Sequence, residues 1–349
     1  MFETARVWWV MLTQVGPMGR SSLGAAKWMR YYVCEALRKD GLFEYLEEAW
    51  NYGQIVAHFG YVDSPYTRQV LETLVNDKNN LLTKHEGAYR RNPKVPLPTL
   101  EAVRRRAPKV FDEISMWQDF ARRIPERMRQ APTDFVRRFE EEGPAVRSFD
   151  RSLNRKIYSA LRQAAFAYVD KGELRGKRLL EVACGSGYET ADLWLWLKGD
   201  VRIAAVDPVP GLLNLAKKQF AEVAGASKKR GVAPLTDDNR PTFHLMNAVD
   251  LEFPDNSFDA VYHSTLLHWT PDPERAIREM GRVLKPGGLV FGTQVTKPHP
   301  SPYIDLIVQV HENVYGFFWE QEFRRWYEQA GIRLSVVTPA GVFKGRKRS

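Results

Sequence analysis

RLLEVACGSG, residues 178–187, is a short apolar run followed at once by a turn with two glycines. Such a run predicts a buried strand, and the residues after Gly187 predict a helix. Glycines at the end of a first strand let a ligand approach the backbone. In open α/β sheets, nucleotides bind in the crevice at the carboxyl ends of the strands. On its own, however, the pattern also fits an ordinary tight strand-to-helix turn.

Further apolar runs follow this stretch, and periodic helical segments such as 276–284 separate them. The runs are Val201–Val206, Thr242–Met246, Phe258–Tyr262 and Leu289–Val295. Strands of this kind with helices between them predict an α/β fold built from right-handed βαβ units around a parallel sheet.

The residues around the glycine turn distinguish two nucleotide cofactors. Asp207 lies twenty residues after Gly187, at the end of the second run, where a carboxylate accepts both ribose hydroxyls. Thr190 stands where a dinucleotide fingerprint has its third glycine, and Glu181 beneath the turn would repel a pyrophosphate. A carboxylate instead suits an ammonium and a sulfonium. The site therefore favours S-adenosyl-L-methionine over a nicotinamide dinucleotide.

The sequence from about Arg178 through Val295 resembles the class I S-adenosylmethionine-dependent methyltransferases. The segments that carry the resemblance stand in order: 179–187, Val206-Asp207-Pro208, 247–251, 253–259, Leu267-His268-Trp269-Thr270-Pro271-Asp272-Pro273 and 283–288. Two positions depart from the family's pattern. Ala183 replaces the usual first glycine, and Asn247 stands where the family mostly carries an aspartate that contacts the adenine amino group. An asparagine oxygen still accepts that hydrogen bond.

The resemblance implies a Rossmann-like, mostly parallel seven-stranded sheet and a role for particular residues. Gly185 and Gly187 would pass the methionine portion of the cofactor, and Asp207 would hold its ribose. Asn247 and the backbone of Ala248 would contact the adenine. The expected cofactor residues are Glu181, Ala183, Gly185, Gly187, Asp207, Pro208, Asn247, Ala248 and His263.

Histidine is the natural base if the acceptor is a hydroxyl or a phenol, and His263, His268 and His311 are the candidates. Of these, we expect His263 or His268 to be the catalytic residue. Each has a structural alternative: His263 as a core histidine, and His268 as an anchor of its own loop.

The amino-terminal half predicts three helices, at Ala25–Leu37, Leu42–Trp50 and Pro65–Lys78, followed by a ribbon at 81–90. This order resembles the winged-helix dimerisation domain of many small-molecule O-methyltransferases. We expect a winged-helix domain at 1–98, a helical linker at 99–170 and a catalytic domain at 171–349. Apolar side chains beyond the needs of one helix predict a homodimer; they are Trp28, Met29, Tyr32 and Val33.

The charge balance and the cysteine content limit the binding partners and the cellular compartment that we expect. Lys and Arg outnumber Asp and Glu by 51 to 42, which permits anionic partners, but the helix expected at 64–80 has no net charge, which argues against DNA binding. Two cysteines exclude a disulfide scaffold and a four-cysteine zinc site; we expect no metal and a cytoplasmic protein. Trp8 and Trp9 permit a shallow membrane contact, although packing on the protein's own body is favoured.

Three functions compete at this stage. We expect O- or C-methylation of a small aromatic or quinone/isoprenoid-like acceptor, in a pocket capped by aromatic residues after the fifth strand. These residues are Tyr303, Tyr315, Phe317 and Trp319. The alternatives are a nucleic-acid methyltransferase and a non-catalytic winged-helix regulator that binds the cofactor or DNA.

Overall fold

A seven-stranded sheet with the order β11-β12-β9-β8-β5-β6-β7 dominates the computed structural model. Strands β5 to β9 run parallel to one another, and β12 pairs antiparallel with β9 and β11. The strands are β5 (Arg178–Val182), β6 (Arg202–Asp207), β7 (Thr242–Leu245), β8 (Phe258–Ser264), β9 (Leu284–Thr293), β11 (Ile332–Val337) and β12 (Val342–Lys347). This confirms the predicted α/β fold with a mostly parallel sheet of seven strands.

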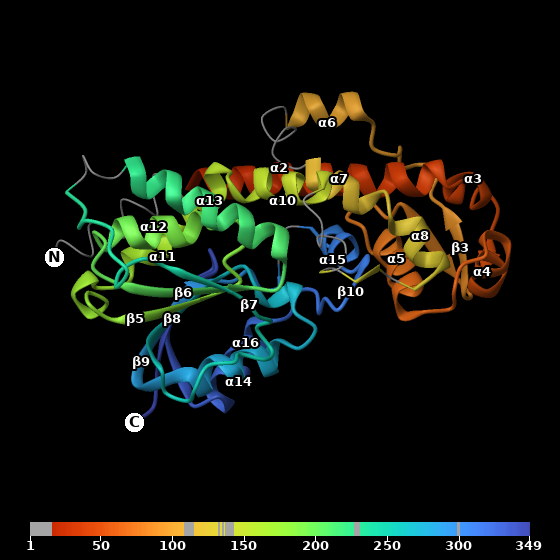
Figure 1. Ribbon diagram of the computed structural model, residues 1–349. Helices are drawn as coiled ribbons and strands as arrows, with labels where there is room; N and C mark the ends of the chain where they lie inside the picture. The colour runs from red at the N-terminus through yellow and green to blue at the C-terminus, as the bar shows by residue number, and fades with distance from the viewer. Residues whose placement is uncertain are drawn as a thin grey trace. The chain divides into compact units, whose positions relative to one another are not determined.

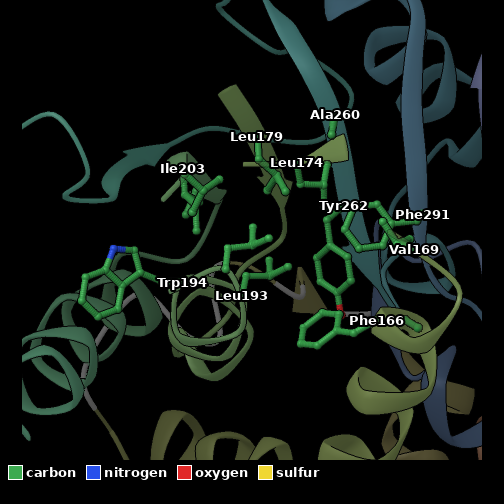
Figure 2. Packing of buried hydrophobic residues seen from close by; sticks show 14 of the residues in the cluster. Phe166, Val169, Leu174, Leu179, Leu193, Trp194, Ile203, Ala260, Tyr262 and Phe291 are labelled. Carbon is green, nitrogen blue, oxygen red and sulfur yellow. The ribbon is translucent and has the colours of Figure 1, made fainter. Parts of the chain in front are cut away.

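Helices cover both faces of this sheet (Figure 1). On one face lie α11 (Lys156–Ala167), α12 (Tyr188–Trp196) and α13 (Pro210–Ala226); on the other lie α14 (Pro273–Val283) and α16 (Glu320–Gln329). Side chains along a strand alternate between the two faces. Leu179 of β5 therefore packs in one core and Leu180 in the other. Figure 2 shows the first core, where Tyr262 of β8 lies beside Phe166 of α11.

The turn between β5 and α12 requires backbone with positive φ. Gly185 and Gly187 have φ of 54° and 81°, and Ala183 has a φ of 60°. A Cβ on Gly187 would lie 2.8 Å from the Cα of Ala216 in α13. Gly187 therefore allows the turn to form and α13 to pack closely behind it.

The structure describes residues 16–107, 115–131, 133–134, 136, 143–226, 231–298 and 301–349. The chain divides into two units, one mainly of Phe135–Pro298 and Asn313–Ser349 and the other of Gly19–Asp134 and His299–Glu312. The first contains the seven-stranded sheet and α10 (Pro144–Leu153). The division differs from the expected boundaries, because helix α11 lies with the sheet and the segment 299–312 lies with the amino-terminal residues.

The second unit is mainly helical. Its longer helices are α2 (Gly16–Lys39), α4 (Tyr52–Phe59) and α5 (Pro65–Val75), and shorter ones are α3 (Leu42–Tyr45), α6 (Leu100–Arg106), α7 (Ser115–Ala121), α8 (Ile124–Arg129) and α15 (Tyr303–Val308). A small sheet joins β1 (Trp50–Asn51), β3 (Ala88–Arg91) and β2 (Leu82–His85), and β4 (Thr133–Asp134) pairs with β10 (His311–Glu312). The first and third expected helices and the ribbon are present, but the expected helix Leu42–Trp50 ends at Tyr45, and α4 was not expected. The assignment to the winged-helix class stays a prediction.

The apolar side chains that suggested a dimer are buried within the chain itself. Trp28 and Val33 have no exposed surface, and Met29 and Tyr32 are nearly as buried. The Trp28 indole N–H donates a hydrogen bond to the Ala107 carbonyl over 3.0 Å. These four side chains therefore do not provide the exposed apolar surface from which the dimer was predicted. Dimerisation stays a prediction without that support.

Membrane contact was expected, if anywhere, near Trp8 and Trp9, which lie outside the described residues. Among the helices that the structure describes, none is both long enough and apolar enough to cross a bilayer.

Candidate functional site

The carboxyl ends of β5 and β6 meet at a hydrogen-bonded carboxylate. Asp207, the last residue of β6, accepts the N–H of Gly185 at Oδ2 and the N–H of Val209 at Oδ1, both over 2.9 Å. The side chain is buried, and burial raises its pKa to about 6 against the opposing effect of the two N–H groups. Each oxygen retains a second lone pair, so a ribose hydroxyl can still donate to it.

Glu181 of β5 is a buried carboxyl group beneath the glycine turn. Neither of its oxygens has a hydrogen-bond partner of good geometry among the residues described. Burial raises its pKa well above the usual range and Glu189 adds to the rise, while the nearby Thr190 hydroxyl and Arg162 oppose it. An unsatisfied buried carboxyl group costs stability unless a ligand supplies the partner. The group fits a cation such as the ammonium of a methionine moiety.

An ion-pair network beside Glu181 was not anticipated from the sequence. Arg162 of α11 lies 2.7 Å from Asp192 (Nε to Oδ2) and 3.9 Å from Glu189 (Nη1 to Oε1). Burial raises the pKa of Glu189 to about 6, and Arg162 limits the rise. Arg162 is itself buried, so this arginine holds α11 and α12 together behind the glycine turn. Helical periodicity indicated that 157–168 is a helix but gave no signal for the pairing.

The residues expected to contact adenine lie after β7. Asn247 Oδ1 accepts the N–H of Val249 over 3.2 Å, which shapes the loop, and Ala248 is buried. The Met246 N–H donates to the carbonyl of Asp207 and so ties this loop to the end of β6. The structure therefore places the Asn247 loop next to Asp207, at the same edge of the sheet.

His263 lies in the interior of the sheet, on β8. It is fully buried, its Nε2 lies 2.6 Å from the Tyr327 hydroxyl, and its ring packs 4.7 Å from that of Phe343. Burial lowers its pKa to about 3. These contacts are typical of a core histidine, which was the structural alternative for His263. They do not support the catalytic and cofactor roles that were expected for this residue.

His268 lies in the turn Leu267–Trp269 after β8. Phe317 stacks on its ring, with centroids 4.4 Å apart and planes at 16°, and the Gly316 N–H donates to its carbonyl over 3.1 Å. Gln294, at the end of β9, lies 3.3 Å from Nδ1 through its amide nitrogen. The structure thus brings together one histidine and one aromatic residue that were expected to serve the acceptor.

The other aromatic residues expected at the acceptor pocket have different surroundings. Tyr303 is buried in the mainly helical unit, where its hydroxyl donates to Asp77 Oδ2 over 2.6 Å, so the expectation that it joins the other three is corrected. Tyr315 is exposed and packs edge-on against Trp326 of α16. Trp319 is 53% exposed and precedes α16. His311 also belongs to the mainly helical unit, where its ring meets that of Phe120.

Helix α10 covers the turn at this edge. Phe149 packs edge-on against Trp269, with ring centroids 6.1 Å apart. The Cδ1 of Leu153 lies 2.8 Å from where a Cβ on Gly185 would be. Part of the segment expected to be a linker therefore packs against the glycine turn and the His268 loop.

The match to known proteins agrees with this geometry. Residues 180–292 match the family described as "Methyltransferase domain". The sheet order and the glycine turn with Asp207 agree with this match, which supports an S-adenosylmethionine-dependent methyltransferase domain in this unit and implies S-adenosyl-L-methionine as its cofactor. The unpartnered carboxyl of Glu181 and the close approach at Gly187 fit that cofactor.

Two curated relatives and one solved structure illustrate the similarity. The 27-O-demethylrifamycin SV methyltransferase of Amycolatopsis mediterranei is 29% identical over 45% of this chain and 54% of its own length. A demethylmenaquinone methyltransferase of Symbiobacterium thermophilum is 32% identical over 35% of this chain and 44% of its own. The chain thus spans about half the length of these relatives. The CurJ carbon methyltransferase is similar in fold, with a TM-score of 0.70 at 14% identity over 99% of this chain and 96% of that one.

Proposed function

We propose that the protein transfers a methyl group from S-adenosyl-L-methionine to oxygen or carbon of a small aromatic or quinone-like acceptor. The stacked pair of His268 and Phe317 carries the proposal, because it sets a polar ring against an aromatic ring, with both side chains buried. Aromatic side chains beside a polar group are typical of sites that bind flat aromatic ligands. The names of the two curated relatives, a rifamycin and a demethylmenaquinone methyltransferase, support the same acceptor class.

The residues of this chain divide the work between the two ligands. Asp207 would hold the ribose, Glu181 the ammonium group, and the loop at Asn247 the adenine. S-adenosylmethionine, when bound, supplies an electrophilic methyl group on a sulfonium. Phe317 would orient the acceptor, His268 would contact its oxygen, and Phe149 with Leu153 of α10 would exclude water from the site.

An acceptor screen tests the proposal. The full chain is incubated with methyl-labelled S-adenosylmethionine and a panel of hydroxyquinones, phenols, phosphatidylethanolamine vesicles and duplex DNA. We expect label on the hydroxyquinones or phenols, and none with Asp207→Ala, while the control Asp237→Ala on an exposed loop retains turnover. Label on DNA or lipid alone would overturn the acceptor class. Cofactor binding with no methyl transfer to any class would favour a regulator.

A further inference from the structure

The side chain of Gln294 is held by three hydrogen bonds that fix the orientation of its amide. Its Oε1 accepts the N–H of Leu267 over 3.0 Å, and its Nε2 donates to the carbonyl of Val295 over 3.0 Å. Nε2 also lies 3.3 Å from Nδ1 of His268. A backbone N–H only donates and a carbonyl only accepts, so the amide cannot be reversed without losing both bonds. The group that faces His268 is therefore an N–H donor.

This orientation decides which ring nitrogen of His268 carries the proton. An amide nitrogen does not accept a hydrogen bond, so Nδ1 must present its lone pair to Gln294. A neutral imidazole has one proton, which then resides on Nε2. We propose that Gln294 is a positioning residue that keeps His268 in the Nε2–H tautomer. In this tautomer Nε2 already carries its proton and Nδ1 is bonded to Gln294, so His268 does not act as the base for the acceptor.

Other contacts keep the ring in this orientation. Phe317 stacks on the imidazole, Trp269 lies 5.0 Å away between ring centroids, and Gly316 N–H holds the backbone of His268. Gln294 is itself 2% exposed, so water does not compete for its amide. A reversal of the ring would place Cδ2–H against the Gln294 N–H and break the existing hydrogen bond. The tautomer is thus set by buried, mutually supporting contacts.

The inference rests on the proposed function and narrows its acceptor. With Nε2 already protonated, His268 does not take a proton from the acceptor, so the acceptor oxygen is ionised before the methyl group is transferred. The acceptor's electron pair forms the new bond to the methyl carbon, the carbon–sulfur pair returns to sulfur, and the anionic and cationic charges cancel. No proton passes to His268. The favoured class is therefore an acceptor already ionised in water, such as a hydroxyquinone or an acidic phenol.

Nuclear magnetic resonance of the full chain labelled with ¹⁵N-histidine tests the tautomer without any turnover. Long-range ¹H–¹⁵N correlations distinguish a protonated Nε2 from a protonated Nδ1, and His268→Gln identifies the signal. We expect the wild-type neutral ring to be protonated at Nε2. In Gln294→Glu a carboxylate faces Nδ1, so the proton should move to Nδ1. The control Gln321→Glu, an exposed residue on α16, should leave the signal unchanged.

A wild-type ring protonated at Nδ1 would overturn the inference, whether or not the variant folds. So would an unchanged tautomer in folded Gln294→Glu. Methyl transfer is a separate readout: turnover on ionised phenols with a protonated Nδ1 would support the proposed function and refute the role of Gln294. Across phenols of increasing pKa, wild-type turnover should fall with the ionised fraction, and Gln294→Glu should weaken that dependence because Nε2 becomes a base.

Discussion

The backbone N–H of Gly185 donates a hydrogen bond of 2.9 Å to Oδ2 of Asp207, and so joins the glycine turn after β5 to the end of β6. One carboxylate therefore both supports the turn and remains available to a ribose. Its buried position links cofactor binding to pH, because only the ionised form accepts hydrogen bonds at both oxygens.

We predict that cofactor affinity falls as the pH is lowered through about 6, the pKa to which burial raises Asp207. Below that value the proton on Asp207 should by itself lower the affinity by at most about tenfold per pH unit, since one proton at this group competes with the ligand. Asp207→Asn should bind more weakly at neutral pH, by roughly 2 to 3 kcal/mol, and should lose this pH dependence. Calorimetric titrations between about pH 5 and pH 8 measure both effects.

The stability of the ligand-free protein should change in the opposite direction. A carboxyl group with a raised pKa binds its proton more tightly in the folded state than in the unfolded chain. The contribution of Asp207 to the free energy of unfolding is therefore largest below its ordinary pKa of 3.8 and is lost as the pH rises through about 6. Asp207→Asn should flatten the unfolding profile in this interval. An equal slope in both proteins would contradict the assignment.

Glu181 should release a proton when the cofactor binds. Burial raises its pKa well above the usual range and so favours the protonated form in the ligand-free protein, whereas a bound ammonium would favour the ionised form. Calorimetry in two buffers of different ionisation enthalpy should show up to about one proton released near pH 7. Glu181→Gln should lower both the proton release and the affinity.

The control for this measurement is Glu222→Gln, an exposed carboxyl on α13. It should retain the wild-type proton release. If Glu181→Gln binds as tightly as wild type with the same proton count, then the ammonium is held by another group.

Local sequence patterns predicted the sheet and one part of the site, namely the glycine turn and Asp207. The glycine turn and Asp207 are adjacent to strands whose apolar runs are readable from the sequence, and parallel neighbours bring strand ends together. Phe317 and His268 were singled out by residue type. Their stacking depends on the path of the chain after β9, and hydrophobic periodicity in the sequence does not predict that path.

Contacts between distant segments account for what the sequence did not reveal. Tyr303 follows the last parallel strand closely, yet it packs in the other unit because its hydroxyl meets Asp77, 226 residues earlier. His263 is in the core because Tyr327 and Phe343 come from later elements. The sequence gives no signal for Gln294, because a single glutamine after a strand belongs to no recognisable pattern. Its contacts with Leu267 and His268 appear only in the folded structure.

Removal of the Phe317 ring should weaken acceptor binding with little effect on the cofactor. Phe317→Ala loses the stacked face beside His268, so the acceptor KM should rise by about tenfold or more, while the affinity for S-adenosylmethionine changes little. Tyr315→Ala, two residues earlier and exposed, is the control and should retain the wild-type KM. Loss of cofactor binding in Phe317→Ala would instead place this ring at the cofactor site.

The two glycines of the turn should differ in their tolerance of a methyl group. At Gly187 a Cβ would meet the Cα and Cβ of Ala216 at 2.8 Å, and this backbone cannot retreat without moving α13. At Gly185 the close neighbour is only the Cδ1 of Leu153, at the far end of a flexible side chain. Both substitutions place an alanine at positive φ, which lowers the free energy of unfolding by about 1 to 2 kcal/mol. In Gly187→Ala the overpacking against α13 lowers it by about a further 1 to 3 kcal/mol. In chemical unfolding, Gly187→Ala should therefore be clearly less stable than Gly185→Ala. Equal destabilisation would mean that α13 does not pack against the turn as closely as described.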